Sequence, residues 1–536
     1  MRRLMSVLAC FVVLLMITTA SFAAETLAKK QELSFNVGTE PETLDPAKST
    51  GVPEAIIELN CFEGLTRMDE KNVPQPAIAE SWTVSKDGKT YVFKLRKTKW
   101  SNGEPLTAHD FEWSWKRALA PETAAEYATQ LWYIKNGQAY NEGELKDASK
   151  VGVRAVDDYT LEVVLENPTT YFLQLCNFPT LMPVNRKVVE KNPEGWFQDI
   201  KNYIGNGPYK IVKWDHSAVM ELVPNENYWR RDEVKLSKLT LYLIDNRQTA
   251  LSMFETGQLD WFDDPPISEI PRLEKEGSLF RSPYIGTYYY MFNVTKKPVD
   301  DVRVRKALTM AIDRQMLIDR VTRGGQEPAL AYVPFGLADG KPGADFRTVG
   351  GNDYIKENLA VAKKLLADAG YPNGKGFPTL TILYNTSENH KKIAEAIQEM
   401  WKKNLGINVQ LTNQEWGVYL ASRDELNYEV ARAGWIGDYM DPMTFLDMWT
   451  TTNGNNDTGW SNKTYDNLIF GSFKVADSIA RAKMLHQAED ILMNEMPIMP
   501  IYFYVNQNVM KPWVKGAVRS PLGFIDFRGA YVLEHK

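Results

Sequence analysis

The sequence predicts an α/β protein with more than one domain. Segments with helical and strand periodicity alternate through its second half, an order typical of α/β units with parallel strand pairing. Of the 536 residues, 44% are hydrophobic and 24% are charged, which is an ordinary globular composition. A chain of this length forms two or three domains of usual size.

The expected elements follow from local patterns along the chain. In the first half, these patterns predict one helix at 108–119 and three strands, at 31–37, 91–96 and 160–165. In the second half, they predict four helices, at 302–322, 358–369, 391–404 and 477–494, and three strands, at 379–384, 407–412 and 499–505. An aspartate before the first of these four helices and glycines after the first three supply the cap signals.

The first 23 residues predict a secretory signal peptide, residues 1–23. Two arginines form a basic start, residues 4–19 are almost wholly apolar, and small residues at 21 and 23 suit cleavage after Ala23. The rest of the sequence contains no stretch long and apolar enough to span a bilayer. We therefore expect a soluble mature chain that is released into a periplasm.

The three cysteines of the sequence lie in different contexts. Cys10 follows Val-Leu-Ala, which resembles a lipoprotein cleavage box, but cleavage there would leave apolar residues 11–19 on the mature chain. We therefore expect no lipid anchor at Cys10. Cys61 and Cys176 remain after export, where a disulfide can form. The sequence leaves open whether these two pair or stay as buried thiols.

Charge and motif content exclude several classes of function. Removing the two arginines of the leader takes the net charge from −6 to −8, and such an acidic surface does not suit nucleic acid, which binds a basic stripe. None of the five histidines lies four residues from another, so the sequence has no HExxH zinc helix. CxxC, GxxxxGK[ST] and GxSxG motifs are absent from it too. We expect no metal, no cofactor and no catalytic residue.

Residues 431–442, ARAGWIGDYMDP, place opposite charges around two glycines at the end of an expected strand. In an extended strand, Arg432 and Gly434 share one face while Trp435 lies on the other. The six residues from Arg432 to Asp438 span at most about 20 Å, whereas a tripeptide is about 10 Å long. The two charges could flank a short zwitterion, or they could pair with each other or with neighbours in a turn. The glycines suit close approach of a ligand or plain turn geometry.

Further polar side chains follow the expected strands of the second half. Asn385 and His390 follow the first of these strands, Trp416 follows the second, and Arg423 lies between it and the ARAGWIGD segment. Ligands of α/β folds bind at strand ends, so these residues are candidates for one site.

Several longer segments are similar to the oligopeptide-binding proteins of peptide ABC importers, which are large extracytoplasmic solute-binding proteins. The similarity extends over essentially the whole mature chain. Its segments are EPETLDPAKSTGVPEAIIELNCFEGL at 40–65, WSNGEPLTAHDFEWSW at 100–115, YYYMFNVTKKPVDDVRVRKAL at 288–308, LYNTSENHKKIA at 383–394, NQEW at 413–416 and ARAGWIGDY at 431–439. Together these segments are highly specific, although no single one would suffice.

The resemblance implies a type II periplasmic-binding-protein-like fold with two lobes, three domains and a ligand cleft at the hinge. Domain I, in lobe 1, would consist of 24–62, 185–285 and 506–536. Domain II, an extra domain of this family, would span 63–184, and domain III, lobe 2, would span 286–505. Closure around a ligand would create the form that a transporter recognises.

The resemblance also implies roles for particular residues. Asp438 would pair with the α-ammonium of a bound peptide, and its C-terminal carboxylate would be received, directly or through water and at different peptide lengths, by Arg432, Arg423 and His390. The backbones of Val52 and Gly434 would pair with the peptide. The walls of the cleft would include Trp416, Trp435, Asn385, Tyr127, Tyr284, Tyr289 and Tyr504.

These roles describe a binding protein and no enzyme. It would capture short peptides by their backbone and charged ends, and deliver them to the membrane permease of an ABC transporter. We expect a monomer with no nucleic-acid partner. The resemblance leaves open another solute in the same fold, such as murein (cell-wall) peptides. A secreted glycosidase or peptidase is the alternative from another class, because catalytic carboxylates can be distant in sequence.

Four positions depart from the pattern of some relatives. Enterobacterial members carry a cysteine pair that aligns with Gly286 and Ile436, so that bridge is missing here. An acidic and a basic group of some members align with Thr50 and Thr322, which are neutral in this chain. The resemblance therefore does not determine the preferred peptide length.

Overall fold

The computed structural model describes residues 26–535, so the predicted signal peptide and Cys10 lie outside the described residues. The described chain folds around one sheet of eleven strands in the order β10-β11-β12-β1-β13-β19-β14-β18-β16-β17, with β15 paired to β19. The strands are β1 (Glu32–Asn36), β10 (Tyr209–Asp215), β11 (Val219–Pro224), β12 (Lys238–Tyr242), β13 (Trp261–Asp263), β14 (Leu279–Phe292), β15 (Glu327–Pro328), β16 (Leu380–Asn385), β17 (Val409–Gln414), β18 (Val430–Ile436) and β19 (Ile498–Met510).

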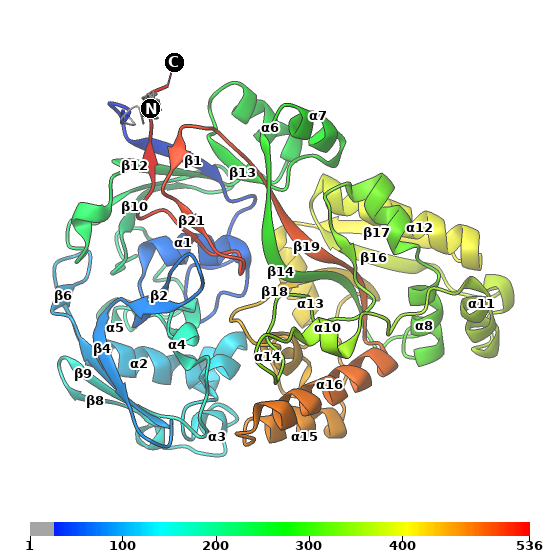
Figure 1. Ribbon diagram of the computed structural model, residues 1–536, viewed down its shortest axis with the longest axis horizontal. Helices are drawn as coiled ribbons and strands as arrows, with labels where there is room; N and C mark the ends of the chain where they lie inside the picture. Colours follow the sequence, from blue (N-terminus) through cyan, green and yellow to red (C-terminus); the bar gives the residue numbers. More distant parts are fainter. Residues whose placement is uncertain (1–25, 536) are drawn as a thin grey trace, which may run out of the picture.

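Two long strands, β14 and β19, cross the middle of this sheet and join the two halves of the molecule (Figure 1). They pair antiparallel, but the register breaks between Pro283 and Thr287. A break of this kind interrupts the ladder and bends the strands, which suits a hinge. The predicted domain boundaries at 285/286 and 505/506 lie beside it, and the three-domain division itself remains a prediction.

The half beyond β14 consists of parallel strands covered by helices. β16 pairs in parallel with β17 and β18, which confirms the expected α/β units. The largest helices of this half are α8 (Val302–Met310), α11 (Leu359–Asp368), α12 (Glu388–Leu405), α13 (Trp416–Asp424), α15 (Lys463–Ser472) and α16 (Ser478–Glu495). The hydroxyl of Ser387 accepts the N–H of His390 at 3.4 Å and so caps α12. This cap fixes His390 in the first helical turn, directly after β16.

The single helix expected at 302–322 is wrong, because the chain there forms three short helices. These are α8, α9 (Arg314–Leu317) and a π-helical turn over Ile318–Thr322. Asp313 has extended backbone angles, and its carboxylate accepts the N–H of Met316 at 2.8 Å. A second N-cap inside the apolar pattern thus starts a new helix.

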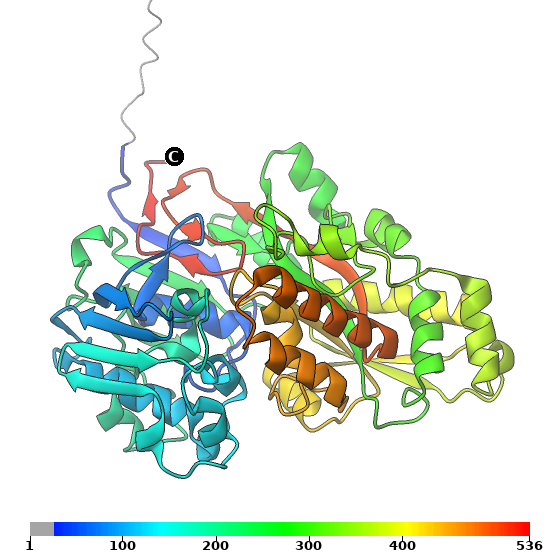
Figure 2. The same ribbon diagram turned by 60° about the horizontal axis from the view of Figure 1, so that its bottom comes forward.

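The half before β14 adds a separate four-stranded sheet in the order β4-β5-β9-β8, seen at the lower left of Figure 2. Its strands are β4 (Ala79–Val84), β5 (Thr90–Leu95), β8 (Val153–Asp157) and β9 (Thr160–Val164). Helix α2 (Ala108–Leu119) packs on this sheet and begins with a capping box between Thr107 and Asp110. The 3₁₀ segment η2 (Glu126–Leu131) carries Tyr127 and Gln130 toward the other half.

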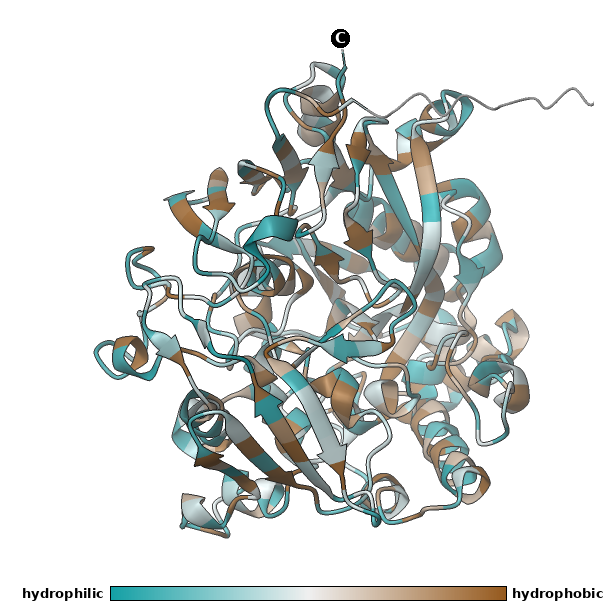
Figure 3. Ribbon diagram, turned by 60° about the vertical axis from the view of Figure 1, so that its left-hand side comes forward, coloured by the Kyte–Doolittle hydropathy of each residue, from teal (hydrophilic) through white to brown (hydrophobic). Residues whose placement is uncertain are grey.

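The core follows the expected alternation of buried and exposed side chains. Every second residue of β11 and β12 is buried, and Figure 3 shows hydrophobic and hydrophilic residues alternating along the strands.

Cys61, at the end of α1 (Val52–Cys61), and Cys176 are both buried and unbonded, so they form no disulfide. Burial raises the pKa of each thiol. Among residues 26–535, no helix is long and apolar enough to cross a membrane.

Candidate functional site

A cavity of about 350 Å³ lies between the two halves of the molecule, beside the hinge strands β14 and β19. A single buried water needs only about 10–15 Å³, so the cavity has room for a ligand together with water. Its lining contains twelve of the thirteen residues that the resemblance assigns to a peptide site: Asp438, Arg432, Arg423, His390, Val52, Gly434, Trp435, Trp416, Asn385, Tyr127, Tyr284 and Tyr504.

Tyr289 is the thirteenth residue, and contrary to expectation it does not line the cavity. Its ring is buried edge-on against Tyr332 and Trp449, at centroid distances of 5.3 and 5.8 Å. The preceding residue, Tyr288, lies with its ring centroid 4.6 Å from the guanidinium of Arg432. Successive side chains of a strand point to opposite faces, so Tyr289 faces the core of the second half instead.

Asp438 follows β18 and is 7% exposed. Its carboxylate accepts hydrogen bonds from Gln130 Nε2 at 3.1 Å, Thr444 Oγ1 at 3.3 Å and Tyr127 Oη at 3.4 Å. No basic side chain of the described residues forms an ion pair with it. Burial, and then the nearby charge of Asp447, raise the pKa of Asp438 well above its usual range. A ligand ammonium at this carboxylate would stabilise the ionised form.

Arg432, on β18, brings the opposite charge to the same cavity. Its guanidinium donates to Tyr504 Oη at 2.8 Å and to Asn385 Oδ1 at 3.3 Å, and it stacks over Tyr288. All of these partners are neutral, and within residues 26–535 Arg432 forms no ion pair. Its Nε is buried without a hydrogen-bond partner. Because a desolvated cation without a counter-ion is costly, Arg432 is suited to receive a carboxylate.

The self-paired turn that the sequence allowed is therefore not formed. Arg432 is held by Tyr504 and Asn385, while Asp438 turns toward Gln130 of the other half. The two charges meet different partners, although they are close in sequence.

Half of β18 has an open edge beside the cavity. β14 pairs along the whole strand from Val430 to Ile436, whereas β16 pairs only with Val430 and Ala431. Gly434 lies in the open half, and a Cβ added there would lie 2.4 Å from Tyr504 Oη. An extended ligand could pair with this edge as an additional strand.

His390 lies next to Arg432 in the cavity lining. Its Nδ1 is 3.3 Å from Tyr288 Oη. Burial, followed by the charges of Arg432 and Arg247, holds the pKa of the imidazole well below its usual range. A neutral imidazole has one N–H, with which it can donate to a carboxylate.

Arg423, in the last turn of α13, is already paired. Its Nη2 lies 2.5 Å from Asp457 Oδ2. Burial, with the charges of Asp424 and Asp457, raises the pKa of Glu126 to about 8, and burial with Asp457 raises that of Asp424 to about 6. All of these groups line the cavity. Acidic side chains thus outnumber the single arginine here, and Arg423 is less suited than Arg432 to receive a free carboxylate.

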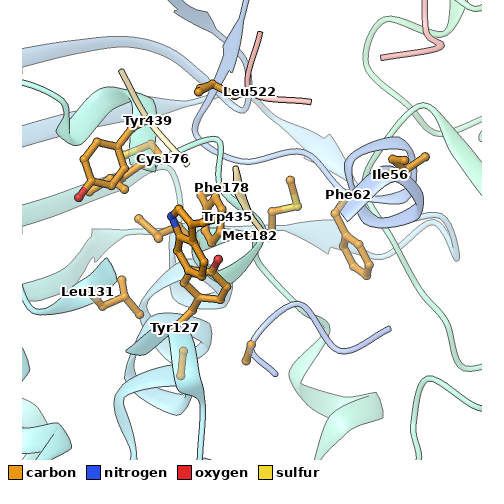
Figure 4. Close-up of a cluster of buried hydrophobic side chains, with 14 of the residues drawn as sticks. Ile56, Phe62, Tyr127, Leu131, Cys176, Phe178, Met182, Trp435, Tyr439 and Leu522 are labelled. Carbon is orange, nitrogen blue, oxygen red and sulfur yellow. The ribbon is translucent and has the colours of Figure 1, made fainter. Parts of the chain in front are cut away.

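Two tryptophans form apolar walls of the cavity. Trp435 lies beside Tyr127 at a centroid distance of 5.9 Å, and Tyr127 packs on Phe178 at 4.9 Å (Figure 4). Trp416 begins α13, and its indole N–H donates to Glu54 Oε1 of α1 at 3.2 Å, so it connects the two halves. The indole nitrogen of Trp435 is buried without a partner, which leaves one donor for a ligand.

The residues that depart from the relatives' pattern fit this geometry. Gly286 and Ile436 are directly opposed in the β14–β18 ladder, and a Cβ on Gly286 would lie 2.4 Å from Ile436 Cδ1. A contact between strands therefore occupies the place of the aligned cysteine pair. Thr50 and Thr322 both line the cavity and add no charge to it.

The sequence patterns missed several charged residues of the lining. The acidic ones are Glu126, Asp263, Asp264, Glu415, Asp424 and Asp457, and the basic one is Arg247. Arg247 is the first residue of α6 (Arg247–Glu255), and Asn246 caps this helix. The available signal was a basic residue at a helix start, where the helix dipole disfavours a cation.

Comparisons with known proteins support this geometry. Residues 73–457 match the family model described as "Bacterial extracellular solute-binding proteins, family 5 Middle". The oligopeptide-binding protein OppA of Bacillus subtilis (strain 168) is 42% identical over 516 residues, which cover 94% of this chain and 93% of the relative. The crystal structure of Haemophilus influenzae OppA in complex with RPPGFSPFR has a TM-score of 0.90 and 37% identity, covering 95% of this chain and 100% of the other.

The murein tripeptide-binding protein MppA of Escherichia coli provides a comparison of conformations. One structure of it matches with a TM-score of 0.88 at 38% identity, covering 95% of this chain and 100% of that one. A structure described as the unliganded open form of an MppA murein tripeptide-binding protein has a TM-score of 0.62 at 37% identity, covering 96% of this chain and 99% of that one. Identity and coverage are nearly equal, so the lower score indicates a different arrangement of the same parts. The structure described here has its halves closed.

Proposed function

This chain belongs to the bacterial extracellular solute-binding proteins of family 5, and we propose that it captures short peptides and delivers them to the permease of an ABC importer. Asp438 would bind the peptide ammonium, Arg432 with His390 the carboxylate, and the open edge of β18 the backbone. The matched relatives are named as peptide-binding proteins, which supports a binding function and no catalysis. We further propose that the protein acts in the periplasm as a monomer.

One observation carries this proposal. The cavity between the halves contains a buried carboxylate, Asp438, and a half-buried guanidinium, Arg432, and neither has a counter-ion among residues 26–535. A peptide with free ends supplies both counter-ions at once. A charge-assisted hydrogen bond contributes about 1.5–3 kcal/mol, so each end would contribute substantially to affinity.

Broad selectivity for peptides follows from what the site would contact. Backbone and terminal charges are common to all peptides, whereas side chains differ. The cavity has apolar walls at Trp416 and Trp435 and room for water beside a ligand. Water adapts its hydrogen bonds to different side chains at little cost. We therefore propose a carrier for peptides of varied sequence.

Closure would connect binding to transport. In the closed structure Trp416 donates to Glu54, and Tyr127 and Gln130 donate to Asp438, so contacts between the halves lie at the cavity itself. A peptide that satisfies Asp438 and Arg432 would favour the closed form over the open one. That form would be the one presented to the permease.

The decisive experiment is mass spectrometry of the small molecules released when the purified protein is denatured. We expect a mixture of peptides roughly two to five residues long. An extended peptide of this length could pair with the open edge of β18 and place its two charged ends near Asp438 and Arg432. Recovery of a single non-peptide solute would overturn the proposal.

The same experiment distinguishes the alternatives. MppA, a relative named for murein tripeptide, makes cell-wall peptides the second candidate. Exclusive recovery of peptides that contain D-amino acids and diaminopimelic acid would favour it. Hydrolysis of added peptides or glycans by the purified protein would favour a secreted hydrolase instead.

A further inference from the structure

Arg247 has the most available donors of the cavity arginines. Arg423 donates to Asp457, and Arg432 donates to Tyr504 and Asn385. A guanidinium has five N–H donors. Within residues 26–535, none of the five of Arg247 makes a hydrogen bond, and its Nε is buried without a partner. Its side chain is only 17% exposed, so water does not fully replace those bonds.

The neighbouring carboxylate compensates Arg247 incompletely. Asp264 Oδ2 lies 3.5 Å from its Nε, beyond the 2.7–2.9 Å that is typical of a charge-assisted hydrogen bond. The Asp264 side chain is 46% exposed, and its Oδ1 already accepts from Asn389 Nδ2 at 3.1 Å. Arg247 thus brings to the cavity a positive charge with unused donors.

Arg247 lies at the opposite end of the cavity from Asp438. It begins α6, whereas the backbone N–H of Asp438 donates to Thr444 of α14 (Met443–Leu446). In Figure 1, α6 lies near the top of hinge strand β14 and α14 lies below the lower end of that strand. Asp264, beside Arg247, accepts from Asn389, the neighbour of His390. The Tyr288 side chain contacts both His390 and Arg432, so these contacts place Arg247, His390 and Arg432 in one part of the cavity.

The other arginine of the lining, Arg423, is less available to an anion than Arg247. Glu126, Asp424 and Asp457 surround Arg423 in another part of the lining, and Asp438 is bonded to Tyr127, the neighbour of Glu126. Arg423 is already paired with Asp457, so it offers little attraction to a terminal carboxylate. We propose that Arg247 is a second carboxylate receptor, which binds the C-terminus of peptides too long to end at Arg432. This inference rests on the proposed function and deepens it. It assigns the C-termini of shorter peptides to Arg432 and those of longer peptides to Arg247.

The experiment measures affinity along a length series. Alanine peptides of two to six residues, each with a free or an amidated C-terminus, are titrated calorimetrically into ligand-free wild type, Arg247→Gln and Arg432→Gln. We expect Arg247→Gln to weaken the longer free-acid peptides by about tenfold or more. The shortest peptides and the amides should change little. The largest loss for Arg432→Gln should occur at a shorter length.

Two further variants control for charge and folding. Arg247→Lys keeps the positive charge and should retain most of the affinity for long peptides. Arg320→Gln removes an exposed arginine outside the lining and should leave every affinity unchanged. Equal losses at all lengths, equal losses for acids and amides, or no loss at all would overturn the role of Arg247 while peptide binding itself stands. If the wild type binds no peptide, the proposed function fails, and this inference fails with it.

Discussion

Arg432 and Asp438 are six residues apart in the sequence, line the same cavity and do not pair with each other. Arg432 lies within β18 and is held by neutral partners, Tyr504 and Asn385. Asp438 follows the strand and accepts from Gln130 of the other half. Asp438 is buried and Arg432 is half-buried, each without a counter-ion within the described chain, an arrangement that costs stability unless a ligand compensates it.

Asp438→Asn should weaken peptides with a free amine far more than N-acetylated ones. Only the former lose a charge pair, and the loss should be about 10- to 150-fold. Calorimetric titration of matched peptides measures it. Asp424→Asn, the same charge change elsewhere in the lining, should not discriminate between the two peptides. An equal loss for both peptides in Asp438→Asn would mean that Asp438 is structural.

The same variant should stabilise the ligand-free protein, and increasingly so as pH rises. The pKa of Asp438 is raised on folding, so above the unfolded value of about 3.9 the folded state holds a proton that the unfolded state has lost. Stability therefore falls as pH increases toward the folded pKa. Asparagine does not titrate, so Asp438→Asn removes this pH-dependent loss of stability.

Thermal unfolding of refolded, ligand-free protein from pH 4 to pH 8 tests this dependence. The melting temperatures should nearly coincide at pH 4, and Asp438→Asn should exceed the wild type by on the order of a degree or two at pH 8. A variant that is less stable at every pH would contradict the raised pKa.

Arg423→Gln should mainly lower the stability of the protein, whereas Arg432→Gln should mainly lower its affinity for peptides. Arg423→Gln leaves Asp457 buried without its partner, which destabilises a protein by about 3–5 kcal/mol. Arg432→Gln breaks no ion pair, so it should unfold like the wild type but lose affinity for free carboxylates. Urea unfolding and titration with free and amidated peptides measure the two quantities. If Arg423→Gln had the larger effect on carboxylate binding, our ranking of the arginines would be wrong.

Gly434→Ala should weaken all peptides, including those blocked at both ends. The new Cβ would lie 2.4 Å from Tyr504 Oη and would disturb the open edge of β18, which no terminal charge can restore. Gly417→Ala is the matched control, because a Cβ there meets Glu42 only at an ordinary 3.6 Å. Affinities for N-acetylated, C-amidated peptides measure the effect. Retained affinity in Gly434→Ala would show that the peptide backbone does not use this edge.

Local patterns predicted most helices and strands of the fold, but they missed a helix start that lies inside a longer run of apolar spacing. The apolar spacing over 302–322 indicated one helix, whereas the cap at Asp313 divides it. The family resemblance identified most of the residues that line the cavity, because related sequences share a tertiary structure. It placed Tyr289 in the lining, although the alternation of β14 turns that ring into the core. Arg247 carried no recognisable motif, since a lone arginine at a helix start has many possible surroundings.

The sequence by itself determined the class of the protein, the strands and helices of its second half, and the two charges of ARAGWIGD as candidates for a zwitterion site. It could not decide whether those charges pair, because pairing depends on groups distant along the chain. Only the tertiary structure brings Gln130, Tyr504 and Asn385 to them and places Asp457 against Arg423. Local propensity fixes backbone and side-chain direction, but the counter-ion of a buried charge is decided by packing across the hinge.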